Sequence, residues 1–291
     1  MSDTRTESLR TTTRPQWRRG AGQRLLLHGG LIFLCLVCMF PFIWMISSSL
    51  KDSALIFSYP PKLIPDPVSW GNYPEAWRQT NMGRAMFNSL LIAVTATFGN
   101  IFVSSMVAYG FAKIPFKGRS VLFMLVLCTM MIPYQVILIP LFIIFKQFGW
   151  INTYYPLIVP SLFGTAVNVF LTRQYMMSIP DAYGDSAFID GCGHIRIWFF
   201  IVLPMSVPVL VSLGVLTFMR HWNDYLGPML YISSQSRMTV PLVLRIFQSS
   251  YTTEWHLLMA AACIALAPVI ILYILCQKFI IGGIMLGGIK G

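Results

Sequence analysis

Charged side chains are scarce in this sequence, and acidic ones are the scarcest. Of 291 residues, 11% are charged and only 10 are Asp or Glu, whereas a soluble domain carries about 25% charged residues. Hydrophobic residues make up 56% of the chain, and its mean hydropathy is +0.67. This composition excludes an ordinary soluble domain and predicts an integral membrane protein.

The motifs of several other protein classes are also missing. There is no G-x-x-x-x-G-K-[ST] phosphate loop, so the chain does not bind a nucleotide by that route. No metal-binding histidine pair at i, i+4 and no nucleophile motif occur, so we expect neither a metal site nor a catalytic site. An ion-coupled solute carrier is the alternative to weigh. The chain of buried acids or histidines and the internal repeat typical of such carriers are not evident.

Long apolar runs dominate what is present. Each run approaches or exceeds the ~20 residues that a helix needs to cross a bilayer. They cover residues 27–49, 88–111, 121–145, 156–172, 198–219 and 257–277. We therefore predict six transmembrane helices within a domain at 25–291, preceded by a polar tail at 1–24. Arginines before the first run, and Lys113, Lys117 and Arg119 between the second and third, place both termini in the cytoplasm by the positive-inside rule.

The predicted spans contain polar and helix-breaking residues. Proline inside a span frees a backbone carbonyl, which is tolerated where neighbouring helices or a water-filled cavity satisfy it. Small and polar residues in the second span let helices approach closely and form hydrogen bonds between them. Prolines of this kind include Pro133, Pro140, Pro204, Pro208 and Pro268. A bundle broken in this way favours a conduit over an inert anchor.

One polar loop, residues 179–197, separates the fourth and fifth runs and contains three aspartates. Pro180 and Asp181 suit the start of a helix, and Gly191 suits a left-handed stop. These signals predict a helix of about ten residues, roughly 15 Å long. Small residues on one of its faces would let a partner approach, and its acids would offer charge to that partner. A solvated loop helix with scattered acids is the alternative.

The segment IPDAYGDSAFIDGCGHIRIWFFIVLPMSVP, residues 179–208, resembles the EAA loop of binding-protein-dependent ABC importer permeases. That pattern runs roughly I-P-x-E-L-x-E-A-A-x-I-D-G-A-S and, a dozen residues later, L-P-x-x-x-P. The matching positions are Ile179, Pro180, Ala187, Ile189, Asp190, Gly191, Leu203, Pro204 and Pro208. Asp185 replaces Glu and Ser186 replaces Ala, whereas Ala182 and Cys192-Gly193 depart further from the pattern. SSSLK at 47–51, HWNDYLGP at 221–228 and the ending GGIMLGGIKG are similar to the carbohydrate-uptake subgroup, especially its MalG-like members.

The resemblance implies an all-α membrane protein with the six-helix type I (MetI-like) permease fold. It implies a non-catalytic subunit of a sugar or oligosaccharide importer in a bacterial or archaeal cytoplasmic membrane. The implied partners are a second homologous permease, a cytoplasmic ATPase dimer that holds ATP and Mg, and an extracytoplasmic solute-binding protein. This chain itself is expected to bind no cofactor.

The resemblance also implies roles for particular residues. Those expected to couple to the ATPase are Ala182, Asp185, Ser186, Ala187, Ile189, Asp190, Gly191 and Gly193, and a C-terminal contact is expected from Gly287, Gly288, Lys290 and Gly291. The loop from about 228 to 256 is expected to meet the binding protein. The candidate substrate path comprises Asn100, Trp222, Asn223, Asp224 and Tyr225. Helix capping is the alternative for Asn223 and Asp224, and interface anchoring is the alternative for the two aromatics.

Overall fold

The computed structural model describes residues 21–248 and 253–288, and every regular element in these ranges is helical. The chain divides into two compact units, Met1–Met45 and Ile46–Gly291. Most of α1 (Ala21–Ser49) belongs to the first unit. The most apolar stretch of this helix is exposed within the structure. A helix that is hydrophobic all round is typical of a membrane span.

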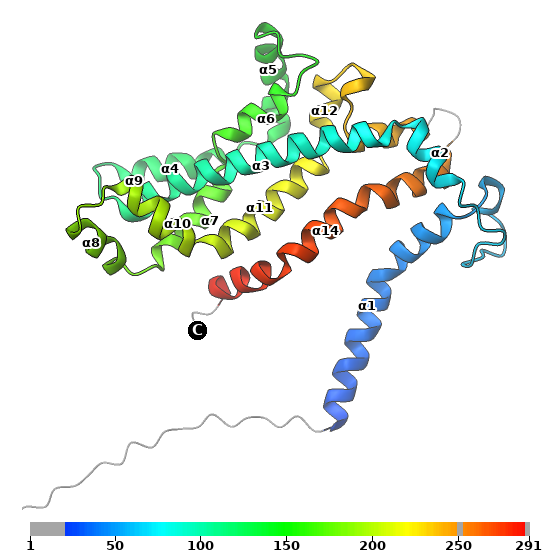
Figure 1. The fold of residues 1–291 in the computed structure, drawn as a ribbon, viewed down its shortest axis with the longest axis horizontal. Coiled ribbons are helices and arrows are strands. Elements are labelled where there is room, and N and C mark those ends of the chain that lie inside the picture. The colour runs from blue at the N-terminus through cyan, green and yellow to red at the C-terminus, as the bar shows by residue number, and fades with distance from the viewer. Residues whose placement is uncertain (1–20, 249–252, 289–291) are drawn as a thin grey trace, which may run out of the picture. The chain divides into compact units, whose positions relative to one another are not determined.

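The second unit is organised around α3 (Met82–Lys113), a helix of 32 residues without a break (Figure 1). It packs against α6 (Tyr155–Leu162), α7 (Ala166–Met177) and α11 (Val207–Trp222), while α14 (Trp255–Gly288) packs against α11. The buried residues of α3 are mostly small or polar. Small side chains let neighbouring backbones approach closely within a membrane bundle.

Four helical stretches are long and apolar enough to span a membrane, and two bent helix pairs raise the number to six if each pair is one span. In the first pair, α4 (Arg119–Thr129) meets α5 (Tyr134–Gln147) at 90°. In the second, His194–Met205 meets α11 at 78°. These stretches cover the six predicted runs. The backbone of α1 begins at Ala21, inside the predicted tail, whose residues 1–20 lie outside the described ranges.

Prolines account for the two sharp bends. Pro133 lies in extended conformation directly before α5, and the residue before a proline is disfavoured in the helical region. Ser206 forms the second bend between Pro204 and Pro208, where α10 (Leu203–Met205) gives way to α11. Before it, a single π-helical turn, η2 (Trp198–Val202), follows α9 (His194–Ile197). Such turns are common at functional sites.

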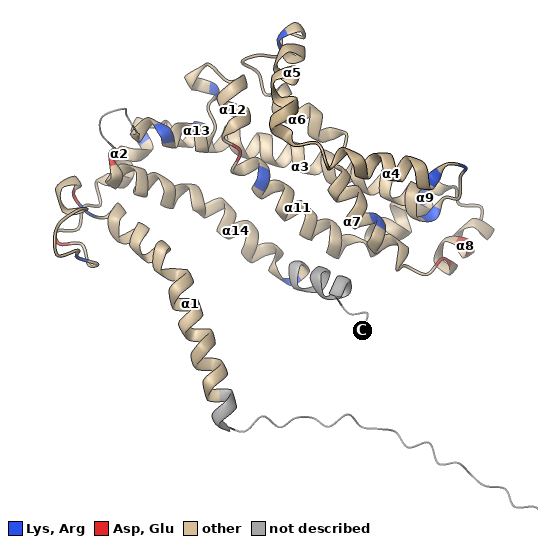
Figure 2. Cartoon of the chain, turned by 180° about the vertical axis from the view of Figure 1, so that it is seen from behind, with Lys and Arg blue, Asp and Glu red and all other residues tan. Residues whose placement is uncertain are grey.

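Short elements close the two ends of the second unit. At one end, called here the α8 end, Lys113 ends α3 close to α8 (Ala182–Ile189). At the opposite end, the α2 end, α3 begins beside α2 (Asn72–Gln79) and α13 (Val240–Leu244). The remaining short elements are η1 (Ser53–Leu55), α12 (Leu226–Tyr231), η3 (Gln235–Arg237) and η4 (Arg245–Phe247). Figure 2 shows acidic residues on α8 and basic residues around α9, while the long helices carry few charges.

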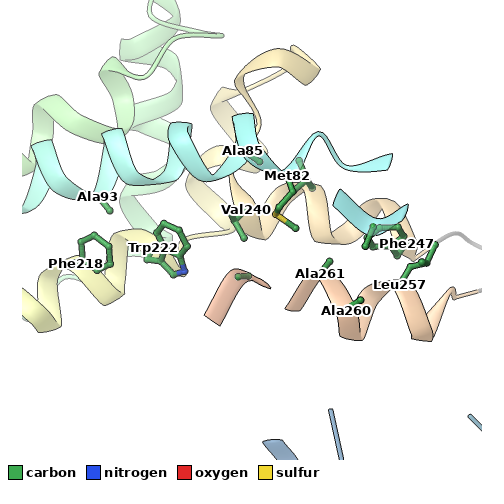
Figure 3. Close-up of a cluster of buried hydrophobic side chains, with 13 residues drawn as sticks. Met82, Ala85, Ala93, Phe218, Trp222, Val240, Phe247, Leu257, Ala260 and Ala261 are labelled. Carbon is green, nitrogen blue, oxygen red and sulfur yellow. The ribbon is translucent and has the colours of Figure 1, made fainter. Parts of the chain in front are cut away.

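The largest hydrophobic cluster holds α3, α11, α13 and α14 together toward the α2 end. Figure 3 shows Met82 and Ala85 of α3 near Val240, with Ala260 and Ala261 of α14 also in the cluster. A second cluster lies at the α8 end, and a third packs α6 against α12 and α5. The second cluster fixes the position of the polar loop described next.

Candidate functional site

The polar loop forms α8, a helix of eight residues. Gly191 ends it in the left-handed conformation, at φ 81°. The N–H of Cys192 donates to the carbonyl of Ala187 at 2.9 Å, and the N–H of Gly191 donates to that of Phe188 at 3.1 Å. This pair of bonds is the Schellman arrangement, which satisfies carbonyls left free at a helix end. The predicted glycine stop is confirmed, and the helix is slightly shorter than predicted.

One side of α8 packs on the bundle through Ala187, which is buried with Met176 of α7, Tyr109 of α3 and Ile197 of α9. Ala187 was predicted to contact a partner. Within this chain Ala187 is 8% exposed, and its small side chain lets α8 lie close to the other helices. The other predicted coupling residues are exposed; they are Ala182, Asp185, Ser186, Ile189, Asp190, Gly191 and Gly193.

The outward side of α8 combines apolar groups with negative charge. Ile189 is 87% exposed, and Phe188 and Tyr183 are more than half exposed. Asp185 and Asp190 lie among them. Charged carboxylates exclude this segment from the hydrocarbon region of a bilayer. Exposed apolar side chains outside the membrane, rimmed by polar groups, are typical of a protein-binding surface.

Lys113, at the end of α3, holds the entry to α8. Its ammonium donates to Asp181 Oδ1 at 2.6 Å and to the carbonyl oxygen of Ile179 at 2.5 Å. This hydrogen bond and the positive charge of Lys113 lower the pKa of the Asp181 carboxyl. The stabilisation from the pair is therefore present above the ordinary carboxyl pKa and is lost only as the pH falls through the lowered folded value. Lys113 was not among the predicted site residues. From the sequence, it contributed only to the positive charge that indicates the cytoplasmic side.

A cavity of about 560 Å³, lined by both polar and apolar side chains, lies between α8 and the ends of α3 and α9. Lys113, Arg119 and His194 line it from one side, and Asp181 and Asp185 line it from α8. The contact of α8 with the bundle is therefore partly open. Room of this kind allows the helix to shift without unpacking a solid core.

A second polar region lies in the middle of the bundle, around Asn100 of α3. Asn100 is fully buried; its Oδ1 accepts from Asn168 Nδ2 at 2.7 Å, and its Nδ2 donates to the carbonyl of Ser161 at 3.1 Å. Asn168 also donates to Thr217 Oγ1 of α11 at 3.0 Å. This set, called here the Asn100 junction, joins α3, α6, α7 and α11.

Replacing Asn100 by leucine is expected to destabilise the chain by about 1 to 3 kcal/mol, because buried partners on α6 and α7 lose a hydrogen bond. The measurement is the temperature at which the detergent-solubilised chain aggregates. The control is Asn223→Leu, since Asn223 is exposed and its side chain donates to the carbonyl of Met219 in the preceding turn, with no other side-chain bond among the described residues. Equal aggregation temperatures for the two variants would contradict a structural role for the junction.

The side chains of the residues predicted for the substrate path after α11 have different environments. Trp222 is buried and stacks on Phe218, with ring centroids 5.8 Å apart, so its ring faces the protein core. Asp224 Oδ1 accepts from the N–H of Gly227 at 3.1 Å, at the start of α12. This bond corresponds to helix capping, the alternative role considered for Asp224. Tyr225 accepts a hydrogen bond from Arg245.

Asp224 nevertheless lines a cavity of about 340 Å³ next to the Asn100 junction. Arg220 and His221 of α11 and Tyr134 of α5 also line it. Ser161 connects the two regions, since its carbonyl accepts from Asn100 and its hydroxyl lies 3.1 Å from His221 Nε2. None of Arg220, His221 and Tyr134 was predicted as a site residue. The signal that could have indicated Arg220 and His221 is a cation followed by a histidine at the end of an apolar run.

The predicted C-terminal contact is described only in part. Gly287 and Gly288 are the last residues of α14, whereas Lys290 and Gly291 lie outside the described residues. Ser212 of α11 donates to the carbonyl of Phe279 at 3.4 Å, which places this part of α14 beside the first half of α11.

The apolar spans, their proline breaks and the buried polar junction define a multi-pass membrane protein with an internal polar region. Residues 100–284 match the model of the family described as "Binding-protein-dependent transport system inner membrane component". The chain belongs to this family. The prediction of an ABC importer permease from the loop motif is confirmed.

Several relatives extend the match over most of the chain. It is 36% identical to the "Probable ABC transporter permease protein YurM" of Bacillus subtilis, over 89% of this chain and 87% of that protein. It is 33% identical to the arabinooligosaccharides permease AraQ of B. subtilis, over 92% and 96%. It is 31% identical to the trehalose/maltose permease MalG of Thermococcus litoralis, over 92% and 98%.

Two solved structures share the fold. One is a bacterial ABC transporter involved in the import of the acidic polysaccharide alginate, with a TM-score of 0.77 and 20% identity over 89% of this chain and 98% of that one. The other is a bacterial alginate ABC transporter in complex with a periplasmic protein that holds an alginate pentasaccharide, with a TM-score of 0.63 and 15% identity over 88% and 94%. The predicted all-α importer permease fold is confirmed.

Proposed function

We propose that this chain is a permease subunit of an ATP-driven importer for a sugar or oligosaccharide, in which α8 docks onto a cytoplasmic ATPase. Family membership supports the transport role, and the names of AraQ and MalG support a carbohydrate substrate. The observation that carries the proposal is α8 itself. It presents exposed apolar and acidic residues on one side and packs on the bundle with the other. An ion-coupled carrier has no evident use for such an element.

The ATPase supplies the energy in this proposal. The chain has no phosphate loop, so ATP and Mg belong to the partner dimer and no cofactor belongs to this chain. Ala182 and Ser186 are small and exposed on α8, so a cleft in the partner can approach the helix closely. Closure of the ATPase dimer would then move α8 and switch the bundle between its two open states.

The remaining partners follow from the same orientation. With α8 in the cytoplasm, both chain termini lie there and the α2 end faces outward. The loop from about 228 to 256, whose residues 249–252 lie outside the described ranges, then meets the solute-binding protein. A second homologous permease completes the pathway. In this chain, the Asn100 junction and the cavity lined by Asp224 form the candidate path for the substrate.

Reconstitution tests the proposal. The complex purified through a tag on this chain should contain a second permease and an ATPase. In liposomes it should take up the sugar held by its binding protein, with ATP inside. A catalytically dead ATPase should reduce uptake to background while leaving the complex assembled.

Two results would refute this function. One is uptake by this chain alone, driven by a proton or sodium gradient without the ATPase. The other is recovery of the tagged chain from its native membrane with no ATPase bound under mild detergent conditions.

A further inference from the structure

Lys113 makes the one ion pair found among the residues that the structure describes. Its side chain is 13% exposed, whereas that of Asp181 is 79% exposed. Its ammonium also bonds the carbonyl of Ile179, so it holds the chain on both sides of Pro180. Asp181 occupies the N-cap position of α8 without capping it. The carboxylate of Asp181 therefore bonds to Lys113 of α3 and does not cap α8.

Three helices surround the entry of α8, and only α3 continues unbroken across the bundle. A movement passed from α8 to α7 would reach the break after Leu162, where Gly164 separates α6 from α7. The path through α9 meets the π-helical turn η2 and then the 78° bend before α11. A break or bend absorbs a displacement, because backbone torsions there can change without unpacking the rest of the helix. A continuous hydrogen-bonded helix passes the displacement on.

The far end of α3 holds the segment before α13. Asn88 Nδ2 donates to the carbonyls of Ser236 and Met238 at 3.2 and 2.9 Å. Ser89 Oγ accepts from the N–H of Val240 at 2.8 Å. With 32 residues, α3 is about 48 Å long at 1.5 Å per residue. It therefore bonds to α8 at one end, to the Asn100 junction in its middle, and to residues 236–240 at the other.

We propose that Lys113 is the positioning residue that ties α8 to α3, so that a movement of α8 shifts α3 and, through Asn88 and Ser89, the segment 236–240. This inference rests on the proposed function, because α8 must be moved by an ATPase for the link to act. Communication runs both ways through such a link. Occupancy of the 236–240 segment by the binding protein therefore shifts the position of α8, and we expect this shift to alter hydrolysis by an ATPase docked on the helix.

The test uses the complete complex in liposomes and measures ATP hydrolysis with and without the loaded binding protein. For Lys113→Ala we expect assembly and unstimulated hydrolysis to stay as in the wild type. Stimulation by the binding protein, and uptake, should fall about 5- to 10-fold, the loss expected for a partly exposed charged hydrogen bond. The matched control is Lys117→Ala, since Lys117 lies in the same connection, is exposed, and forms no described ion pair.

Charge exchange separates transmission from general damage. Lys113→Glu and Asp181→Lys should each lower stimulation, and combining them should restore much of it, because the pair forms again with opposite polarity. A merely structural role for Lys113 predicts no such restoration. Lys113→Arg should retain most of the stimulation, since it keeps both the charge and donors.

The outcomes discriminate between the two proposals. If the wild-type complex contains no ATPase or shows no ATP-dependent uptake, the proposed function fails. If the wild type works and Lys113→Ala is stimulated as strongly as Lys117→Ala, the link through Lys113 is wrong. Loss of the ATPase from the Lys113→Ala complex, or failure of the charge exchange to restore stimulation, would also overturn it, because Lys113 would then act in docking or folding.

Discussion

Gly164→Ala is expected to destabilise the solubilised chain by about 2 to 5 kcal/mol. Gly164 has φ +79°, and a Cβ there would lie 2.8 Å from Ser104 Oγ and 3.3 Å from the Ser104 backbone nitrogen. The left-handed conformation costs a residue with a side chain about 1 to 2 kcal/mol. Overpacking against α3 adds about 1 to 3 kcal/mol. The break between α6 and α7 is thus held against α3 at a point where only glycine fits.

Gly118→Ala is the matched control for this prediction. Gly118 has a similar φ of +84°, but a Cβ there would meet nothing within 4 Å. Alanine at Gly118 therefore carries the backbone cost alone. The difference between the two aggregation temperatures in detergent reports the contact with Ser104. If both variants lose the same stability, a Cβ at residue 164 is accommodated without a clash, and the predicted overpacking against Ser104 is wrong.

The membrane spans could be predicted from the sequence because their signal is local. An apolar run of sufficient length needs no knowledge of its neighbours, and helices cover most of each of the six predicted runs. The bends could not be predicted with the same detail. Pro133, Pro140 and Pro268 all lie within predicted spans, yet the pair containing Pro133 turns by 90°, while Pro268 lies inside the continuous helix α14. The surrounding helices decide which proline becomes a corner.

The polar loop was predictable to a similar extent. Pro180, Asp181 and Gly191 marked the ends of α8 because capping depends on residues next to each other in sequence. Which face of α8 would be buried depended on α7, α3 and α9. The packing of Ala187 against these helices could therefore not be predicted from the motif that it matches. Lys113 was missed for the same reason, since its partner Asp181 lies 68 residues away.

The residues after α11 illustrate a different limit. A span that is apolar on every side has no periodic pattern of polar residues from which its buried face could be predicted. Trp222 and Tyr225 therefore looked equally suited to a sugar ring, and only the structure places Trp222 in the core with Phe218. Asn100 was identifiable, because a buried amide in a span needs partners. Its actual partners, Asn168 and Ser161, come from another span.

Ile189→Asp is expected to weaken binding of the proposed ATPase by about 10- to 100-fold and to reduce uptake in parallel. Ile189 is 87% exposed, and burying an isoleucine side chain in an interface contributes about 1.5 to 3 kcal/mol. Aspartate loses that contribution and adds a third charge beside Asp185 and Asp190, which must be desolvated on docking. Insertion and folding should be unaffected, because the side chain touches little of its own chain.

The measurement is the amount of ATPase retained on the tagged chain during washing, followed by ATP-dependent uptake. Ile64→Asp is the control, since Ile64 is 79% exposed and lies in the connection between η1 and α2, toward the α2 end. Retention by the Ile64 variant and loss by the Ile189 variant would place the docking surface on α8. An aspartate buried in the contact between α8 and the ATPase would lower the affinity of the ATPase for this chain. Equal retention by both variants would therefore mean that the exposed apolar side of α8 faces something other than the ATPase.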